Sequence, residues 1–149
     1  MRAVVQRVRA ASVEVDGRIA GQIDRGIVVF LGIGRGDGEE AMRYLGEKIL
    51  DLRIFPDEKH SMNQSLRDVR GEILLVSQFT LFGDCRKGRR PSFDGAESPG
   101  RAEEAYREFA KYLSEQGHPP REGVFGASML VRLENDGPVT ILLDSEKEF

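Results

Sequence analysis

Two short polar segments contain the residue types that could act on a bound ligand. Ser77-Gln78-Phe79-Thr80-Leu81 follows the apolar run Ile73-Leu74-Leu75-Val76, so hydroxyl and amide groups stand at the end of an expected strand. Asn135-Asp136-Gly137-Pro138-Val139-Thr140 leads into a second apolar run. Ser and Thr are also ordinary at strand ends, and Asn-Asp-Gly is ordinary turn chemistry. Thr80 is a candidate nucleophile, but no neighbouring base in the sequence would activate its hydroxyl.

The sequence lacks the motifs of the common hydrolases and nucleotide-binding proteins. His60 and His118 are its only histidines and have no metal-ligand spacing, and there is no Gly-x-Ser-x-Gly segment. The segment Gly32–Gly38 joins an expected strand to an expected helix, but it lacks the Lys-Ser/Thr ending of a phosphate loop. It is better interpreted as a flexible connection. We therefore expect no metal and no cofactor.

A basic loop follows the first polar segment. Its cations are Arg86, Lys87, Arg89 and Arg90, and glycine and proline beside them indicate an exposed turn. Such a run is either a solvated turn or a phosphate-binding surface. Cys85 stands next to these cations, which favour its thiolate, but the base and the oxyanion partner of a cysteine hydrolase are missing.

Composition places the chain among soluble globular proteins. Its 149 residues suit one domain, 40% are hydrophobic, 32% are charged, and the net charge is −3. No stretch approaches the ~20 apolar residues of a membrane span. A single cysteine suits a reducing compartment. The expected location is the cytoplasm, with no membrane association.

Alternating and continuous apolar runs predict many strands. We expect strands over residues 3–8, 12–15, 18–23, 27–33, 52–55, 73–79, 129–133 and 139–143. Asp16-Gly17 is a hairpin signal, and the last two strands are expected to form a pair. With two helices, this pattern predicts one α+β domain over residues 1–149 with a mainly antiparallel sheet.

The two helices have recognisable starts. Asp37 is the expected N-cap of the first, with Glu40 completing a capping box. Ser98 is the expected cap of the second, with Pro99 at its first position and Gly117 as its stop. Apolar stripes are expected at Ala41, Leu45, Ile49 and Leu52, and at Ala102, Ala105, Tyr106, Phe109, Ala110 and Leu113.

The two polar segments together resemble the signature motifs of the D-aminoacyl-tRNA deacylases, which hydrolyse D-amino acids from mischarged tRNA. The N-terminal segment Met1–Val8 and the basic loop are also similar to that family. The resemblance implies a barrel-like sheet, a homodimer, and a substrate bound by its aminoacylated 3′ end. It implies that Arg86, Lys87, Arg89 and Arg90 contact tRNA phosphates.

The resemblance also implies a catalytic role for Ser77, Gln78, Phe79 and Thr80. Backbone N–H groups near Phe79 and Thr80 would stabilise the developing oxyanion, and the 2′-hydroxyl of the terminal adenosine would help to hold the attacking water. Because the substrate is an activated ester, positioning and oxyanion stabilisation can supply much of the acceleration. Whether a side chain acts as base or nucleophile stays open.

Gly137 and Pro138 are implied to form a Gly-cisPro element that enters the partner's site and rejects L-amino acids. Glycine lets the backbone approach the substrate closely, and a backbone wall cannot swing away. Such a filter would also admit glycine mischarged on tRNA(Ala). Arg7, Val139 and Thr140 are the expected supporting residues.

Two departures and two alternatives remain. Phe82 and Cys85 stand where many relatives have Tyr and Thr, with Ser77–Leu81 unaffected. The chain could instead be a non-catalytic tRNA-binding module that uses its basic loop. It could also be an editing domain for a wrong L-amino acid, a function that would not need the Gly137-Pro138 step. The preferred amino acid and tRNA species are not readable from the sequence.

Overall fold

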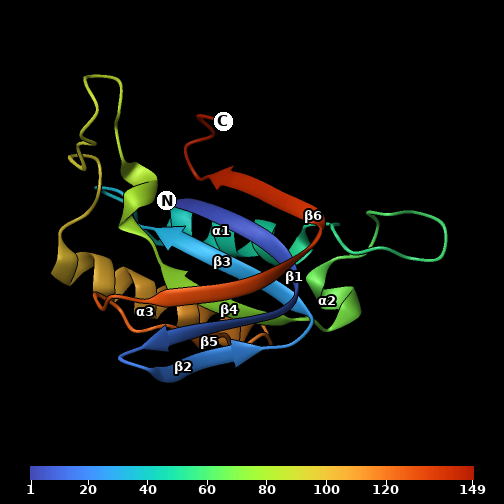
Figure 1. Cartoon of the computed structure of the whole chain (residues 1–149). Coiled ribbons are helices and arrows are strands. Elements are labelled where there is room, and N and C mark those ends of the chain that lie inside the picture. Colours follow the sequence, from blue (N-terminus) through green and yellow to red (C-terminus); the bar gives the residue numbers. More distant parts are fainter.

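A strongly curved six-stranded sheet with two long helices on one face dominates the computed structural model, which describes residues 1–149 (Figure 1). The strands are β1 (Arg2–Val15), β2 (Arg18–Ile23), β3 (Gly26–Gly32), β4 (Glu72–Ser77), β5 (Arg121–Glu122) and β6 (Leu130–Asp144). The helices are α1 (Glu39–Asp51), α2 (Leu66–Val69) and α3 (Pro99–Glu115), and a 3-10 turn, η1, spans Phe79–Phe82. No helix has the length and apolar character needed to cross a membrane.

β1 organises the sheet, because it pairs antiparallel with β2, β3 and β6. The next two neighbours are parallel: β4 runs with β3, and β5 runs with β4. β2 curls back toward β5, so that a Cβ at Gly21 would lie 2.6 Å from the Glu122 carbonyl oxygen. The predicted α+β class and barrel-like sheet are confirmed, and the sheet is mixed and nearly closed.

Two hydrophobic clusters stabilise this curved sheet. The larger one lies between the sheet and the two long helices, and it includes Val29, Leu31, Leu45, Phe109 and Leu113. The smaller one lies on the other side of the curve, and it is built from Val8, Val13, Ile23, Val28, Leu74 and their neighbours. Since successive strand residues face opposite sides, β3 and β4 contribute to both clusters and therefore read as continuous apolar runs.

The positions of both long helices and the N-cap residue of α3 are predicted correctly, but the N-cap of α1 is not. Asp37 does not cap α1: the N-cap is Gly38, without a side-chain hydrogen bond. The Asp37 carboxylate instead accepts hydrogen bonds from the Met1 amine at 2.5 Å and from the Gly34 N–H at 2.6 Å. Ser98 is the N-cap residue of α3 and Pro99 its first residue, as expected, although the Ser98 hydroxyl donates to the Glu97 carboxylate and makes no capping hydrogen bond.

One predicted strand is absent from the structure, and another ends earlier than predicted. Residues 52–55 are not a strand, and Phe55 forms only an isolated bridge with Gln64. The strand predicted over residues 73–79 stops at Ser77. Its partner β3 ends immediately after Leu31, the residue paired with Ser77, so the chain has no further ladder to follow and turns into η1.

The prediction that the last two strands pair with each other is also wrong. Residues 130–144 form one long strand, β6, and both of its halves pair with β1. The ladder is irregular between Gln6 and Ala11 of β1, where Asn135 still pairs with Val8 but Asp136–Val139 have no partner. This turn-like segment therefore forms an irregular bend within one strand and does not connect two strands into a hairpin.

Candidate functional site

The turn after β4 presents backbone N–H groups. The Gln78 N–H donates to the Leu31 carbonyl at 2.8 Å, and the Leu81 N–H donates to the Gln78 carbonyl at 3.3 Å. The first amides of a helix have no acceptor within it, and neither Phe79 nor Thr80 donates in any of the turn and loop backbone hydrogen bonds. Two adjacent N–H groups are therefore available to a ligand.

The side chains of this turn do not form a nucleophile–base pair. The Gln78 Nε2 amide donates to the Thr80 hydroxyl oxygen, so the partner of Thr80 is an amide and not a base. The Phe79 ring is 58% exposed and lies edge-on to Phe93 at 4.9 Å between ring centroids. The turn can thus offer hydrogen bonds and an apolar surface, but its side chains supply no general base.

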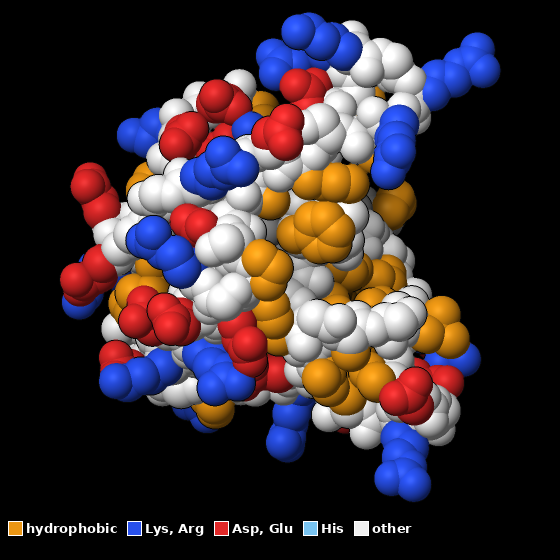
Figure 2. Space-filling view, turned by 90° about the vertical axis from the view of Figure 1, so that its left-hand side faces the viewer, with side chains coloured by type: hydrophobic (Ala, Val, Ile, Leu, Met, Phe, Trp, Pro, Cys, Tyr) orange, Lys and Arg blue, Asp and Glu red, His pale blue; other side chains and the backbone are white.

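A cavity of about 550 Å³ opens beside this turn, with Ser77, Gln78 and Phe79 on one wall. The facing wall comes from the segment before β6 and from its first residues, including Phe125 and Met129. Figure 2 shows hydrophobic side chains gathered around a hollow on this face of the molecule, below the cations at the top of the view. The cavity lies within the size range of small-molecule binding sites.

No sequence motif pointed to the facing wall. The cavity is also lined by residues that belong to neither motif: Glu97, Phe125, Gly126, Ala127, Met129 and Val131. One local signal was present in the sequence, where Phe125 precedes Gly126. The structure gives this glycine a φ of +74°, which is typical of a turn. An aromatic side chain in a glycine-containing loop is a candidate ligand contact, because loops carry much of protein function.

Arg7 holds the Gly137-Pro138 bend in place through hydrogen bonds. This peptide bond is cis, as the resemblance implied, and Gly137 has a φ of +135°. Arg7, only 7% exposed, donates from Nε to the Asp136 carbonyl at 2.9 Å, and from Nη1 to the Ile54 carbonyl. The guanidinium thereby ties the bend to the loop that follows α1.

A second set of contacts comes from residues of β6 itself. The Val139 N–H donates to Asn135 Oδ1 at 2.8 Å, and Val139 is buried. The Thr140 hydroxyl oxygen accepts hydrogen bonds from Gln6 Nε2 at 3.0 Å and from Asn135 Nδ2 at 3.1 Å. The predicted supporting residues are therefore in contact with the bend, whose own Gly137 and Pro138 stay exposed.

The structure does not bring the two motifs together within one chain. Ser77 lies in one row of the sheet with Leu31 and Ala3, whereas Asn135 pairs with Val8. Five residues separate Ala3 from Val8 along β1, which corresponds to about 17 Å. The Ser77–Thr80 turn and the Gly137-Pro138 bend consequently lie at opposite ends of the sheet (Figure 1).

The basic loop projects from the body beside η1 (Figure 1). Arg86 is neutralised within the loop, since its guanidinium bonds both carboxylate oxygens of Asp84, at 2.7 and 2.9 Å. These hydrogen bonds lower the pKa of Asp84 to about 2 and raise that of Arg86. Lys87, Arg89 and Arg90 are exposed without an ion pair and are free to contact phosphates.

Cys85 and the histidines do not form a second catalytic site. Cys85 is exposed and lines a depression that contains no histidine. His60 lies in the exposed loop after α1, where its backbone N–H donates to Asp57, and His118 follows the last turn of α3. No base is therefore placed beside the thiol.

Comparisons with known proteins agree with this arrangement. The family model of D-Tyr-tRNA(Tyr) deacylase matches residues 4–144. The chain is 62% identical to a D-aminoacyl-tRNA deacylase of Halothermothrix orenii and 57% identical to one of Syntrophobacter fumaroxidans, over the full length of each chain. The chain belongs to the D-aminoacyl-tRNA deacylase family.

Solved structures give the same fold. A c-Myc DNA unwinding element binding protein superposes with a TM-score of 0.91 at 44% identity, over 97% of this chain and 98% of that one. A probable eukaryotic D-amino acid tRNA deacylase superposes with a TM-score of 0.80 over 96% of this chain and 98% of that one. At 22% identity, the latter likeness concerns the fold alone.

Proposed function

We propose that this protein is a homodimeric hydrolase that removes D-amino acids from tRNA, with each catalytic site completed by its partner subunit. The observation that carries the proposal is the cavity beside the Ser77–Thr80 turn, whose lining includes Phe79, the first of two adjacent residues with a free N–H group. Family membership supports the activity itself, an aminoacyl-tRNA ester hydrolysis that proofreads translation.

The cavity would take the terminal adenosine of the tRNA with its aminoacyl group. Aromatic rings are stacking surfaces for unpaired bases, and Phe125 and the exposed ring of Phe79 both line the cavity. Lys87, Arg89 and Arg90 would contact acceptor-stem phosphates near the mouth. Arg86, paired with Asp84, would contribute less.

The proposed reaction is addition of water to the ester carbonyl followed by loss of the 3′-oxygen of the tRNA. The carbonyl oxygen becomes negative during addition, and the N–H groups of Phe79 and Thr80 would donate to it. The proton of the attacking water passes, with help from the substrate 2′-hydroxyl, to the departing oxygen. The products are the free D-amino acid and intact tRNA.

The chirality filter is proposed to come from the partner, because one chain keeps its two motifs about 17 Å apart along β1. A partly exposed apolar row supports association: Val4 pairs with Phe30 on one side and with Leu142, 57% exposed, on the other. Cross-strand neighbours point to the same sheet face, and the helices cover the opposite face. This row is the proposed dimer contact.

In the dimer, the Gly137-Pro138 backbone would face the α-carbon of the substrate in the partner's cavity. Arg7 and Asn135 hold this bend, so the wall cannot retreat from an L side chain. Glycine has no side chain to exclude, and glycine mischarged on tRNA(Ala) is therefore a proposed second substrate. The proposed place of action is the cytoplasm, where aminoacyl-tRNAs are used.

The direct test compares deacylation of D-tyrosyl-tRNA and L-tyrosyl-tRNA by the purified protein in the presence of a chelator. We expect rapid loss of the D ester alone. Loss of both esters would contradict the filter, and loss of the L ester alone would favour an editing domain for an L-amino acid. Salt-sensitive tRNA binding without hydrolysis would favour a non-catalytic binding module. Sedimentation of the same sample checks the dimer.

A further inference from the structure

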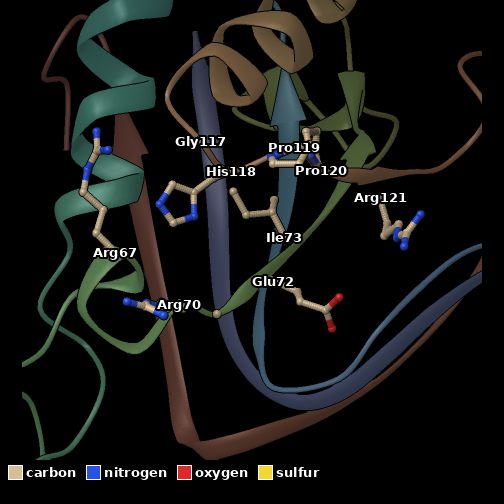
Figure 3. A pocket seen from close by; sticks show the side chains of 10 residues that line it. Arg67, Arg70, Glu72, Ile73, Gly117, His118, Pro119, Pro120 and Arg121 are labelled. Atoms are coloured by element: carbon tan, nitrogen blue, oxygen red, sulfur yellow. The ribbon is translucent and has the colours of Figure 1, made fainter.

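A second cleft lies at the opposite end of β4 from the Ser77 turn. Its volume is about 640 Å³, and it is bounded by α2, the start of β4 and the segment after α3 (Figure 3). Its titratable side chains are mostly basic: Arg67, Arg70, Arg121 and His118, against one acid, Glu72. The whole protein has a net charge of −3, so this excess of cations is local.

Two of these arginines are not engaged by protein groups. Arg67 is used internally, since it bonds Asp51 at 3.0 Å and the backbone carbonyl of Gln116 at 3.4 Å. Arg70 and Arg121 form no ion pair and no side-chain hydrogen bond, and both are exposed. The Glu72 carboxylate accepts the Asp24 N–H at 2.7 Å, which directs part of its hydrogen bonding away from the cleft.

The backbone that carries these side chains is well anchored. Arg70 ends α2 in a left-handed conformation with φ 50°, and its N–H bonds the carbonyls of the preceding turn. His118 follows Gly117, and its N–H bonds the Leu113 carbonyl at 2.9 Å. Arg121 belongs to β5 and pairs with Leu74. The cations are therefore presented from fixed positions around one opening.

His118 adds a hydrogen-bonding group to this opening. Its ring lies between Arg67 and Ile73 at the cleft wall (Figure 3). Burial, and then the charge of Arg67, lower the pKa of the imidazole, so it is neutral near pH 7 and donates one N–H. Arginines with one neutral donor suit phosphate oxygens, because guanidinium groups bind them in a bidentate manner.

The sheet register connects this cleft with the Gly137-Pro138 bend. Glu72 pairs with Gly26, Gly26 pairs with Val8, and Val8 pairs with Asn135. The cleft and the bend thus share one end of the sheet, three strand spacings or about 14 Å apart. The chain's own catalytic turn lies at the other end of β4, five residues or about 17 Å away.

We propose that this cleft binds backbone phosphates of the tRNA whose aminoacyl end occupies the partner's site. The proposal rests on the proposed function, because it requires the bend to enter that site. The cleft and the bend lie at the same end of one rigid sheet. When the bend enters the partner's site, the cleft therefore lies beside the RNA that leads away from the reacting ester. Each tRNA would be held by the basic loop of one subunit and by Arg70 and Arg121 of the other.

The C-terminus of α3 offers a simpler explanation for one of these cations only. Positive side chains stabilise the partial negative charge at a helix end, and Arg67 does so through its bond to the Gln116 carbonyl. Arg70 and Arg121 bond no helix carbonyl through their side chains. A contact with RNA phosphates would explain why Arg70 and Arg121 stand unpaired at the same opening.

The test compares R70A/R121A with a charge-matched control, R18A/R43A, which removes two exposed arginines outside the cleft, Arg43 being paired with Glu39. Each protein is assayed on D-tyrosyl-tRNA and on 3′-D-tyrosyl-adenosine, an ester without phosphate. In R70A/R121A we expect KM for the tRNA to rise about tenfold at low salt, with kcat retained. The slope of log(kcat/KM) against log salt should become shallower by about 1.4, or ~0.7 for each lost phosphate contact.

An unchanged tRNA KM in R70A/R121A, relative to the control, would overturn the proposal. Titration with inorganic phosphate, followed by the NMR signal of the His118 ring, separates the two sources of phosphate. Saturable phosphate binding with an unchanged tRNA KM would assign the cleft to a free anion and overturn the RNA contact. Failure of the unmodified protein to hydrolyse 3′-D-tyrosyl-adenosine would instead count against the proposed function, since no cleft contact is involved.

Discussion

The two polar motifs differ in how their backbones are used. The Ser77–Thr80 turn leaves the N–H groups of Phe79 and Thr80 unused, and its side chains bond mainly to each other. At the Gly137-Pro138 bend, side chains instead satisfy the backbone, with Arg7 bonding the Asp136 carbonyl and Asn135 accepting the Val139 N–H. One region offers backbone donors, and the other is a braced backbone surface.

This difference predicts different sensitivities to mutation. A region that works through free N–H groups should tolerate changes to its side chains, since the donors stay in place. A braced surface should be sensitive wherever a side chain holds the backbone or where a new Cβ would displace it. Four predictions test the contrast.

The largest effect is expected for Gly137→Ala. Its φ of +135° is unfavourable for any L side chain, and a Cβ would lie 2.8 Å from Val139 Cγ2 and 2.9 Å from Arg7 Nη2. Displacing a wall by about 1 Å can lower a rate about 100-fold. We expect at least that loss in D-tyrosyl-tRNA deacylation. Gly100→Ala is the matched control, because nothing lies within 4 Å of its added Cβ. Equal activity of the two variants would contradict a close-fitting bend.

Arg7→Ala should come next, through stability as well as activity. It removes buried hydrogen bonds to the carbonyls of Asp136 and Ile54. Bonds from a charged donor contribute about 1.5–3 kcal/mol each, so loss of the two should lower the free energy of unfolding by about 3–6 kcal/mol. Urea denaturation measures it. Arg9→Ala is the control, because Arg9 also bonds Asp136 but its side chain is 76% exposed. Similar losses in both variants would refute the bracing role of Arg7.

A smaller effect is expected in the basic loop. K87A/R89A/R90A removes three unpaired cations and should raise KM for D-tyrosyl-tRNA about tenfold at low salt, less so at high salt. Arg86→Ala removes a cation already paired with Asp84 and should change KM far less. Steady-state kinetics over a salt series distinguishes the two. If Arg86→Ala had the greater effect, the pairing would not describe the loop on tRNA.

The smallest effects are expected for Ser77→Ala and Thr80→Val. If the N–H groups of the turn stabilise the oxyanion, loss of these hydroxyls should lower kcat less than about tenfold, whereas removing an oxyanion donor lowers it 100- to 1,000-fold. Single-turnover deacylation measures the step directly, with Thr80→Ser as the conservative control. A loss far above 1,000-fold in Thr80→Val, restored by serine, would identify a nucleophile instead.

Local patterns predicted much of the fold. Apolar periodicity located α1, α3 and the early strands, because each signal depends on residues a few positions apart. Errors occurred where distant groups compete. Asp37 has cap chemistry but binds the Met1 amine, and β4 stops where β3 no longer pairs with it. Asn135–Pro138 has turn chemistry, yet β1 pairs on both sides of it.

The sequence by itself determined the two motifs, the basic loop, the α+β class and the family resemblance, because these depend on residue type and short spacing. Only the tertiary structure decided which residues meet. It placed Phe125 and Met129 opposite Ser77 and aligned Glu72 with Asn135 across the sheet. It also separated the two motifs within one chain. Strand register sets these relations, and register depends on pairing between distant segments that no short window of sequence contains.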